Sequence, residues 1–213
     1  MHDLPSLVVI GTGGLGRGVA ALVEAINACE PTWNLTGFVD DDENLHGQSV
    51  MGYSVHGDVD WLSLQADLRY VIAIGNGMTR RRIAGKLAEA DVQSASILHP
   101  SVSIHRTAEV GSGTVLRDGV SSSVDFQIGP HTVVNMNCTI GHDSVLGSFV
   151  TLHPGVHVSG SALLETGVTM GSGSVVLPNT TVGRSATIGA GGVVTEDLPA
   201  HCTAVGVPAR PLS

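Results

Sequence analysis

The sequence predicts two folds in one chain: a small α/β, Rossmann-like domain over residues 1–95 and an all-β, three-sided parallel solenoid over residues 96–213. Three observations carry this prediction. In the N-terminal part, short apolar runs that end in glycine or aspartate alternate with helical patterns. Beyond residue 96, apolar residues recur at every sixth position. Only 3% of the 213 residues are aromatic although 42% are hydrophobic, so the core is expected to be aliphatic.

The N-terminal third consists of alternating strand and helix patterns. An apolar run at residues 7–10 predicts a buried strand, which is followed by a G-x-G-x-x-G turn at 11–16 and a helix over 17–28. The glycines of such a turn let backbone N–H groups at the start of the helix approach an anionic group. Further strands are expected at 35–39, 53–55 and 70–74, and further helices at 59–65 and 79–90. This alternation implies a parallel sheet that binds ligands at the C-terminal ends of its strands.

The length of this domain favours a mononucleotide over a dinucleotide as its ligand. A dinucleotide-binding fold uses two such halves, and residues 1–95 have room for one. Asp40 and Asp41 could accept hydrogen bonds from a ribose or a base edge, or they could belong to a solvated acidic turn over residues 40–43. Arg80, Arg81 and Arg82 could neutralise a diphosphate, although at least two of them could simply be surface charges of the helix.

A strict six-residue repeat predicts the second fold. From Leu98 to Val194, every sixth residue is apolar except Ser122, and the residues four positions later are mostly small or β-branched. Neither an α-helix nor a β-meander has this period. It fits a triangular solenoid, in which each six-residue side points one aliphatic residue inward and then bends at a corner. Three such sides make one coil, so Asn135 and His153, which are three sides apart, are expected to stack on one face.

The composition excludes several classes of function. A formal net charge of -9 argues against nucleic acid or an anionic membrane as a partner, because both need a positive surface. No stretch approaches the roughly 20 apolar residues of a membrane span, and the N-terminus lacks the basic start of a signal peptide. Cys29, Cys138 and Cys202 are too widely spaced for a disulfide framework or a zinc knuckle. We therefore expect a soluble, cytoplasmic protein.

The repeat region resembles the left-handed parallel β-helix of the hexapeptide-repeat acyltransferases. Residues 205–210 (VGVPAR) resemble the G-x-P-A-[RK] element that closes those solenoids near the acyl-CoA. Together, the glycine turn, the acidic pair 40–41, residues 73–76 (AIGN) and residues 140–143 (IGHD) resemble the PglD/NeuD-type sugar acyltransferases over nearly the whole chain. The resemblance implies that acetyl-CoA is the donor and that a nucleotide sugar is the substrate. It also implies a homotrimer with active sites between neighbouring solenoids.

The same resemblance implies particular site residues. His142 is expected to be the general base, supported by Asp143, with Asn135 near the reacting group; the alternative for His142 is a corner histidine that caps backbone groups. The nucleotide sugar is expected to contact Gly13, Gly14, Leu15, Asp40, Asp41, Gly75 and Asn76. The acyl-CoA is expected to contact Thr151, Ser172, Gly189, Ala190 and Arg210, and His153 joins this set because it shares a face with Asn135.

The sequence departs from the family pattern at two of these positions. The family more often has Glu where this chain has Asp143, and amine-acetylating relatives often have His where this chain has Leu15. The expected activity is transfer of acetyl to the amino group of a UDP-linked 4-amino sugar that is destined for a surface glycan or a glycoprotein. The alternatives are O-acetylation of a sugar such as sialic acid, and a non-catalytic scaffold that binds a nucleotide sugar. No metal is expected, because His153 and His157 have H-x3-H spacing instead of the H-x4-H of γ-type carbonic anhydrases.

Overall fold

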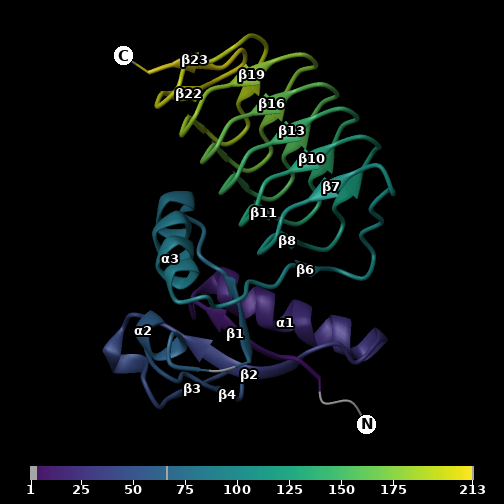
Figure 1. The fold of residues 1–213 in the computed structure, drawn as a ribbon. Coiled ribbons are helices and arrows are strands. Elements are labelled where there is room, and N and C mark those ends of the chain that lie inside the picture. Colours follow the sequence, from purple (N-terminus) through teal and green to yellow (C-terminus); the bar gives the residue numbers. More distant parts are fainter. Residues whose placement is uncertain (1–3, 66, 213) are drawn as a thin grey trace. The chain divides into compact units, whose positions relative to one another are not determined.

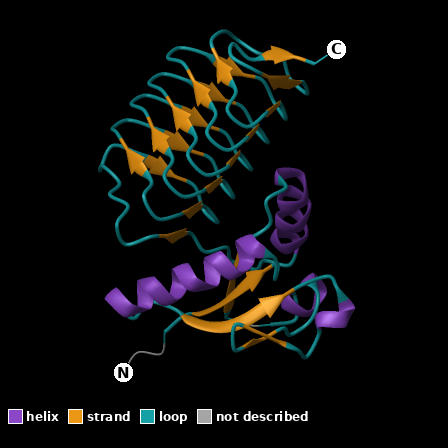
Figure 2. Cartoon of the chain, turned by 180° about the vertical axis from the view of Figure 1, so that it is seen from behind, coloured by secondary structure: helices purple, strands orange, loops and turns teal. Residues whose placement is uncertain are grey.

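The computed structural model describes residues 4–65 and 67–212. The chain divides into two compact units, Met1–Leu98 and His99–Ser213, which are shown as one ribbon in Figure 1. The first unit mixes helices and strands, whereas the second is built of short strands joined by turns (Figure 2). Within the described residues, no helix is both long enough and apolar enough to cross a membrane.

The first unit is built around a three-stranded parallel sheet of order β2-β1-β5, as the alternating pattern predicts. Its strands are β1 (Ser6–Ile10), β2 (Asn34–Val39) and β5 (Leu68–Ile72), and its long helices are α1 (Gly14–Cys29) and α3 (Gly77–Glu89). The chain passes from the central β1 to β2 on one side, and later to β5 on the other. This reversal of strand order opens a crevice beyond the C-terminal ends of the strands.

Two local predictions for this unit were incomplete. The segment expected as a strand over 53–55 does not extend the three-stranded ladder as a full strand, although Val55 forms a parallel bridge with Phe38 of β2. Instead, β3 (Ser49–Val50) and β4 (Tyr53–Ser54) form an antiparallel hairpin, because Met51 and Gly52 both have positive φ and make a two-residue turn. The helix expected over 59–65 is α2 (Val59–Leu62), and the chain continues through Gln65 in tighter i to i+3 turns. The remaining short elements are η1 (Glu43–Leu45) and β6 (Ile97–Leu98).

The second unit is the predicted three-sided parallel solenoid. Each strand pairs with the strand one coil further on, as in Val133 with Thr151 and Thr151 with Thr169. One side contains β7 (Glu109–Val110), β10 (Gln127–Ile128), β13 (Val145–Leu146), β16 (Leu163–Leu164) and β19 (Thr181–Val182). The next contains β8 (Val115–Leu116), β11 (Val133–Val134), β14 (Thr151–Leu152), β17 (Thr169–Met170), β20 (Thr187–Ile188), β22 (Thr203–Val205) and β23 (Arg210–Pro211). The third contains β9 (Ser121–Ser122), β12 (Thr139–Ile140), β15 (His157–Val158), β18 (Val175–Val176) and β21 (Val193–Val194).

The corners of the solenoid have a regular backbone. Every sixth residue from Gly113 to Gly191 has a positive φ, whether it is glycine or not. The inward aliphatic row is buried from Leu116 to Val194 except at Ser122, and the small residues four positions later are buried as well. Both the backbone conformation and the burial of side chains therefore repeat every six residues. The last strand, β23, turns back antiparallel to β22 and covers its edge.

Candidate active site

A cavity of about 330 Å³ lies at the C-terminal ends of β1, β2 and β5. Six residues that were expected to bind the nucleotide sugar line it together, namely Gly13, Gly14, Leu15, Asp40, Asp41 and Gly75. Apolar contacts come from Ile10, Val59, Ala73, Ile74 and Ile83. The fold therefore collects residues from three loops that are far apart in the sequence.

The glycine turn places the start of α1 at this cavity. Gly13 is the N-cap residue and has no side chain to satisfy the first N–H groups of the helix. A Cβ atom at Gly16 would collide with the carbonyl oxygen of Gly11, so the helix can pack this tightly on the end of β1 only with glycine there. The exposed N–H groups and the positive end of the helix dipole favour an anionic ligand.

The Asp40 side chain links the loop after β2 to the glycine turn after β1 by hydrogen bonds. One oxygen of its carboxylate accepts hydrogen bonds from the backbone N–H of Thr12, at 2.8 Å, and from the Thr12 hydroxyl, at 2.7 Å. The other oxygen accepts from the backbone N–H of Asp42. Desolvation raises the pKa of Asp40, but these hydrogen bonds and the nearby His46 outweigh it, so the net pKa is below the usual value. The Asp40 carboxylate is thus ionised and largely occupied before any ligand binds.

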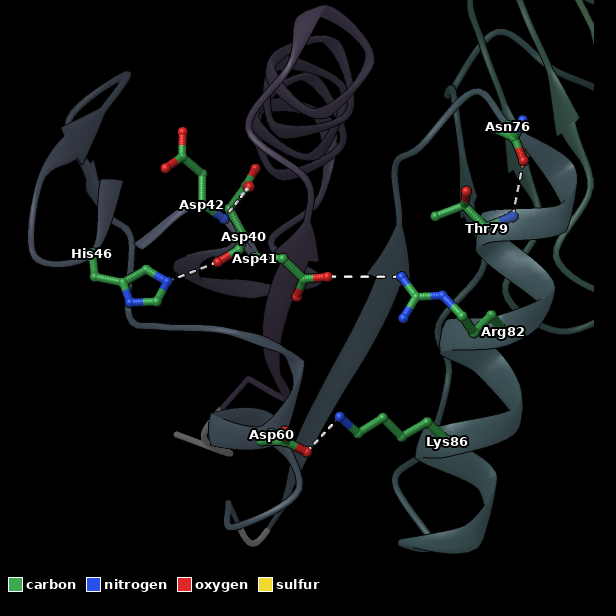
Figure 3. Close-up of polar contacts among 9 residues, drawn as sticks. All are labelled: Asp40, Asp41, Asp42, His46, Asp60, Asn76, Thr79, Arg82 and Lys86. Carbon is green, nitrogen blue, oxygen red and sulfur yellow. Dashed lines mark hydrogen bonds and ion pairs between the residues drawn. The ribbon is translucent and has the colours of Figure 1, made fainter. Parts of the chain in front are cut away.

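Asp41 is more available than Asp40. Its carboxylate lies 3.8 Å from the guanidinium of Arg82 on α3, and both side chains are exposed. Figure 3 shows this pair beside a second one between Lys86 of α3 and Asp60 of α2, at 2.6 Å. Because exposed ion pairs exchange easily with water, Asp41 can release Arg82 to accept a hydrogen bond from a ligand.

Arg80 does not have the phosphate-binding or surface role considered from the sequence. Its side chain is fully buried and donates hydrogen bonds from Nη1 to the carbonyl oxygens of Ile74, at 2.8 Å, and Gly75, at 3.0 Å. Burial lowers the pKa of Arg80 to about 10, so the side chain stays charged at neutral pH. Arg80 therefore holds the loop after β5, which forms one wall of the cavity, whereas Arg81 and Arg82 are exposed.

Asn76 is also placed differently from the other expected substrate residues. It is not among the residues lining the cavity. Its side-chain oxygen accepts a hydrogen bond from the backbone N–H of Thr79, at 2.9 Å, and so caps the N-terminus of α3 (Figure 3). Asn76 therefore fixes where the helix that carries Arg80 begins.

In the solenoid, His142 and Asp143 form a hydrogen-bonded pair at a corner. Nδ1 of His142 lies 2.7 Å from Oδ2 of Asp143, and the two side chains are 61% and 60% exposed. Asp143 occupies a positive-φ corner position, with φ of 56°. With the Nδ1 proton donated to Asp143, Nε2 is left as an acceptor that faces away from the carboxylate. The shorter Asp side chain thus reaches the imidazole.

Asn135 and His153 stack as the predicted coil requires. Each follows a strand of the same side, and their backbone N–H groups donate to Leu152 and Met170 one coil on. Both are half-buried. The side-chain oxygen of Asn135 accepts a hydrogen bond from the backbone N–H of Met136, which leaves its NH₂ group as the available donor.

The remaining residues expected to bind acyl-CoA differ in exposure. Ser172 and Ala190 are exposed at corners, whereas Thr151 is buried and Gly189 donates its backbone N–H to Ala204. Arg210 forms an ion pair with Glu196, so its charge is already partly balanced. No group of three or more His, Cys, Asp or Glu side chains among residues 4–65 and 67–212 could hold a metal ion.

Comparisons with known proteins identify the family. Residues 6–87 match the model of the PglD N-terminal domain. The whole chain is similar to the acetyltransferase domain of PglB from Neisseria gonorrhoeae, solved with acetyl coenzyme A, at 31% identity over 99% of this chain and 100% of that one, with a TM-score of 0.90. The chain belongs to the hexapeptide-repeat sugar acetyltransferases of the PglD/NeuD type.

Two further solved structures resemble this sugar acetyltransferase over almost its full length. PerB from Caulobacter crescentus, solved with CoA and GDP-perosamine, is 30% identical over 99% of each chain, with a TM-score of 0.87. WeeI from Acinetobacter baumannii is 31% identical over 97% of this chain and 99% of that one, with a TM-score of 0.86. A comparison with curated proteins found no match.

Sequence reasoning missed the roles of two residues that shape the cavity of the α/β unit. Thr12 sits inside the glycine turn, and its bonds to Asp40 follow from parallel strands ending at the same edge of the sheet. Arg80 lies at helical spacing with the buried residues Ile83, Ala84 and Leu87. That i, i+3, i+4, i+7 pattern was the available signal that Arg80, alone of the three arginines, faces inward.

Proposed function

We propose that this acetyltransferase transfers acetyl from acetyl-CoA to the amino group of a UDP-linked 4-amino sugar, with His142 as general base. The observation that carries the proposal is the 2.7 Å contact between His142 Nδ1 and Asp143 on an exposed corner. It fixes the tautomer that leaves Nε2 free to accept a proton. A corner histidine that only capped backbone groups would have no need of a carboxylate partner.

In this mechanism, His142 Nε2 accepts the proton of the sugar amine as the amine nitrogen attacks the thioester carbonyl carbon. Asp143 stabilises the imidazolium that forms, and a backbone N–H group donates to the oxyanion. The carbon–sulfur bond then breaks, and His142 returns the proton to the departing CoA sulfur. The products are an N-acetylated sugar and CoA, and the imidazole is neutral again.

The cavity of the α/β unit supports a nucleotide-linked acceptor sugar, which the protein would bind through the nucleotide. The open start of α1 at Gly13 and Gly14 suits a diphosphate, and Asp41 can accept hydrogen bonds from a ribose or a base. The GDP-perosamine held by PerB makes a GDP-linked amino sugar the second candidate substrate. Leu15 presents an apolar side chain to the cavity, so the sugar amine must be oriented by other groups.

We also propose that the protein is a homotrimer in which neighbouring solenoids complete each active site. The exposed position of His142 on a corner supports this, because acyl transfer from a thioester needs a site that excludes water. Sedimentation equilibrium should then give three times the 21.8 kDa mass of the chain. A monomer that is fully active at assay concentrations would contradict this part of the proposal.

The role of His142 is tested by replacing it with alanine and measuring the release of CoA thiol. If His142 is the base, kcat should fall by about 10² to 10⁴ while both substrates still bind. His157→Ala is the matched control, since His157 is another exposed solenoid histidine, hydrogen-bonded to Thr139. A loss of less than about threefold in His142→Ala, with binding intact, would remove it from this role.

The substrate is tested with a panel of UDP-, GDP-, dTDP- and CMP-linked sugars, each offered with a free amine or a free hydroxyl. Turnover with the UDP-linked 4-amino sugar supports the proposal. Turnover only with hydroxyl acceptors, such as CMP-linked or free sialic acid, would make the protein an O-acetyltransferase. Tight binding of a nucleotide sugar without turnover of any acceptor would favour a non-catalytic scaffold.

A further inference from the structure

Gly160 lies directly against the imidazole of His142. It is one full coil further along the chain, and the backbone N–H of its neighbour Ser161 donates to the carbonyl oxygen of His142 at 2.8 Å. A Cβ atom built on Gly160 would lie 2.5 Å from Nε2 of His142, 2.6 Å from Cε1 and 3.0 Å from Cδ2. These distances are well inside van der Waals contact, so any side chain at 160 must displace the ring.

The backbone of Gly160 does not itself require glycine. Its φ is not in the positive region that favours glycine, in contrast to the corner residues one position further on. The equivalent place in the other sides of the solenoid, two residues after the inward aliphatic residue, always carries a side chain. These residues are Ser112, Asp118, Val124, Pro130, Met136, His142, Ser148, Pro154, Thr166, Ser172, Pro178, Arg184, Ala190 and Glu196.

A neighbouring glycine shows what a purely structural requirement looks like. A Cβ atom at Gly141 would strike the backbone of Ser159 and Gly160 in the next coil, so that glycine is needed for the coils to stack. At Gly160 the three nearest atoms all belong to the His142 side chain. The absent side chain at 160 therefore leaves room for the imidazole, whereas the absent side chain at 141 leaves room for the chain itself.

We propose that Gly160 is a positioning residue for the catalytic histidine. By leaving the space beneath the ring empty, it lets the imidazole lie over the next coil with Nδ1 on Asp143 and Nε2 available for the substrate amine. A methyl group at 160 would push the ring aside by on the order of 1 Å, because ordinary carbon contacts need about 3.5 Å. The inference rests on the proposed role of His142 and adds the residue that sets the orientation of its ring.

The test is a double-mutant cycle with Gly160→Ala, His142→Ala and the combined variant, assayed for kcat and for KM of both substrates. Gly160→Ala should lower kcat by about 10- to 100-fold, since a displacement of this size is enough to spoil proton transfer, and should leave both KM values within about twofold. In the His142→Ala background the same change should have no further effect, because no ring remains to be displaced. Gly85→Ala is the matched control, since a Cβ atom there meets nothing within 4 Å, and it should keep full activity.

Each other outcome overturns the inference in a recognisable way. If Gly160→Ala keeps the wild-type kcat while His142→Ala is impaired, His142 remains the base and Gly160 does not position it. If Gly160→Ala lowers kcat equally in both backgrounds, it acts by another route. A loss of cooperative unfolding in Gly160→Ala would show that the coil itself needs glycine there. If His142→Ala is fully active, the proposed mechanism fails and the positioning role fails with it.

Discussion

The two units of this chain build their sites by opposite rules. In the solenoid, a residue stacks on its counterpart one coil later, so the neighbours of His142 can be found by counting along the sequence. In the α/β unit, the cavity joins loops that follow β1, β2 and β5, and no fixed spacing relates Gly13 to Asp40 or Gly75. In a repeat, the residues that become neighbours can therefore be predicted from their spacing in the sequence. In a crevice of a sheet, they depend on the order in which the strands are arranged.

The largest effect on stability is expected in the core of the solenoid. Leu152→Ala should lower the free energy of unfolding by about 2–5 kcal/mol, because it leaves a cavity in a narrow aliphatic column where Leu152 is fully buried. Urea denaturation followed by circular dichroism measures this change. Leu177→Ala, at a side chain that is 38% exposed, is the control and should cost far less. Equal costs at both positions would contradict the view that the inward row carries the fold.

The next effect lies in the α/β unit, where one side chain supports a wall of the cavity. Arg80→Met should lower the free energy of unfolding by about 1–3 kcal/mol, since the carbonyls of Ile74 and Gly75 lose their buried donor. The KM for the proposed nucleotide-sugar substrate should rise, while the KM for acetyl-CoA stays unchanged. Arg81→Met alters an exposed neighbour on the same helix and serves as the control. An unchanged KM for the nucleotide sugar in Arg80→Met would show that the wall holds without this contact.

A smaller and pH-dependent effect is expected where two loops of the cavity are fastened together. Thr12→Val removes the hydroxyl donor to Asp40 but keeps the backbone N–H, so at pH 7 it should cost about 0.5–1.5 kcal/mol. Because the pKa of Asp40 is lowered on folding, its contribution to stability is present above its unfolded pKa of 3.8 and is lost as the pH falls through the folded value.

The difference between Thr12→Val and the unmodified protein should therefore shrink below about pH 4. Denaturant titrations at pH 7 and under acidic conditions measure it. A difference that grows at low pH would show that the Thr12 hydroxyl does not stabilise the ionised carboxylate.

The smallest effect is expected at the exposed pair between Arg82 and Asp41. Arg82→Ala should change the free energy of unfolding by less than about 1 kcal/mol, because both side chains are solvated and salt screens them. Urea denaturation at low and high salt measures the change. A loss of several kcal/mol would mean that the pair is part of the structure of the cavity and not a contact that a ligand can exchange.

The solenoid could be predicted from the sequence in more detail than the α/β unit, because its contacts repeat at a fixed spacing. The six-residue repeat predicted the solenoid, its inward row of aliphatic residues and the stacking of Asn135 on His153. This was possible because residues at the same position of successive coils pack on one another. The alternation of strands and helices predicted a ligand site at the C-terminal ends of the parallel strands, where the cavity lies, because these ends share an edge of the sheet.

Contacts that depend on side-chain direction were not predicted. Asp40 was expected either to bind the ligand or to belong to a solvated acidic turn, and its hydrogen bonds from Thr12 and Asp42 were not predicted; its contact with a ligand stays a prediction. The cap that Asn76 forms on α3 was not predicted, and its expected contact with the substrate stays a prediction. The antiparallel hairpin of β3 and β4 was missed because its turn consists of Met51 and Gly52, and methionine gives no signal for a positive φ.

The positive-φ corner at every sixth residue restricts how the length of the solenoid can change. Deleting a single residue would shift the series so that members of the inward small row, such as Val120 and Thr132, had to adopt the conformation now held by Gly119 and His131. Adding or removing a whole coil would leave every later residue on its own side and corner. The solenoid can therefore become longer or shorter by complete coils without moving any residue to another side or corner, while one extra residue must bulge outward as a loop.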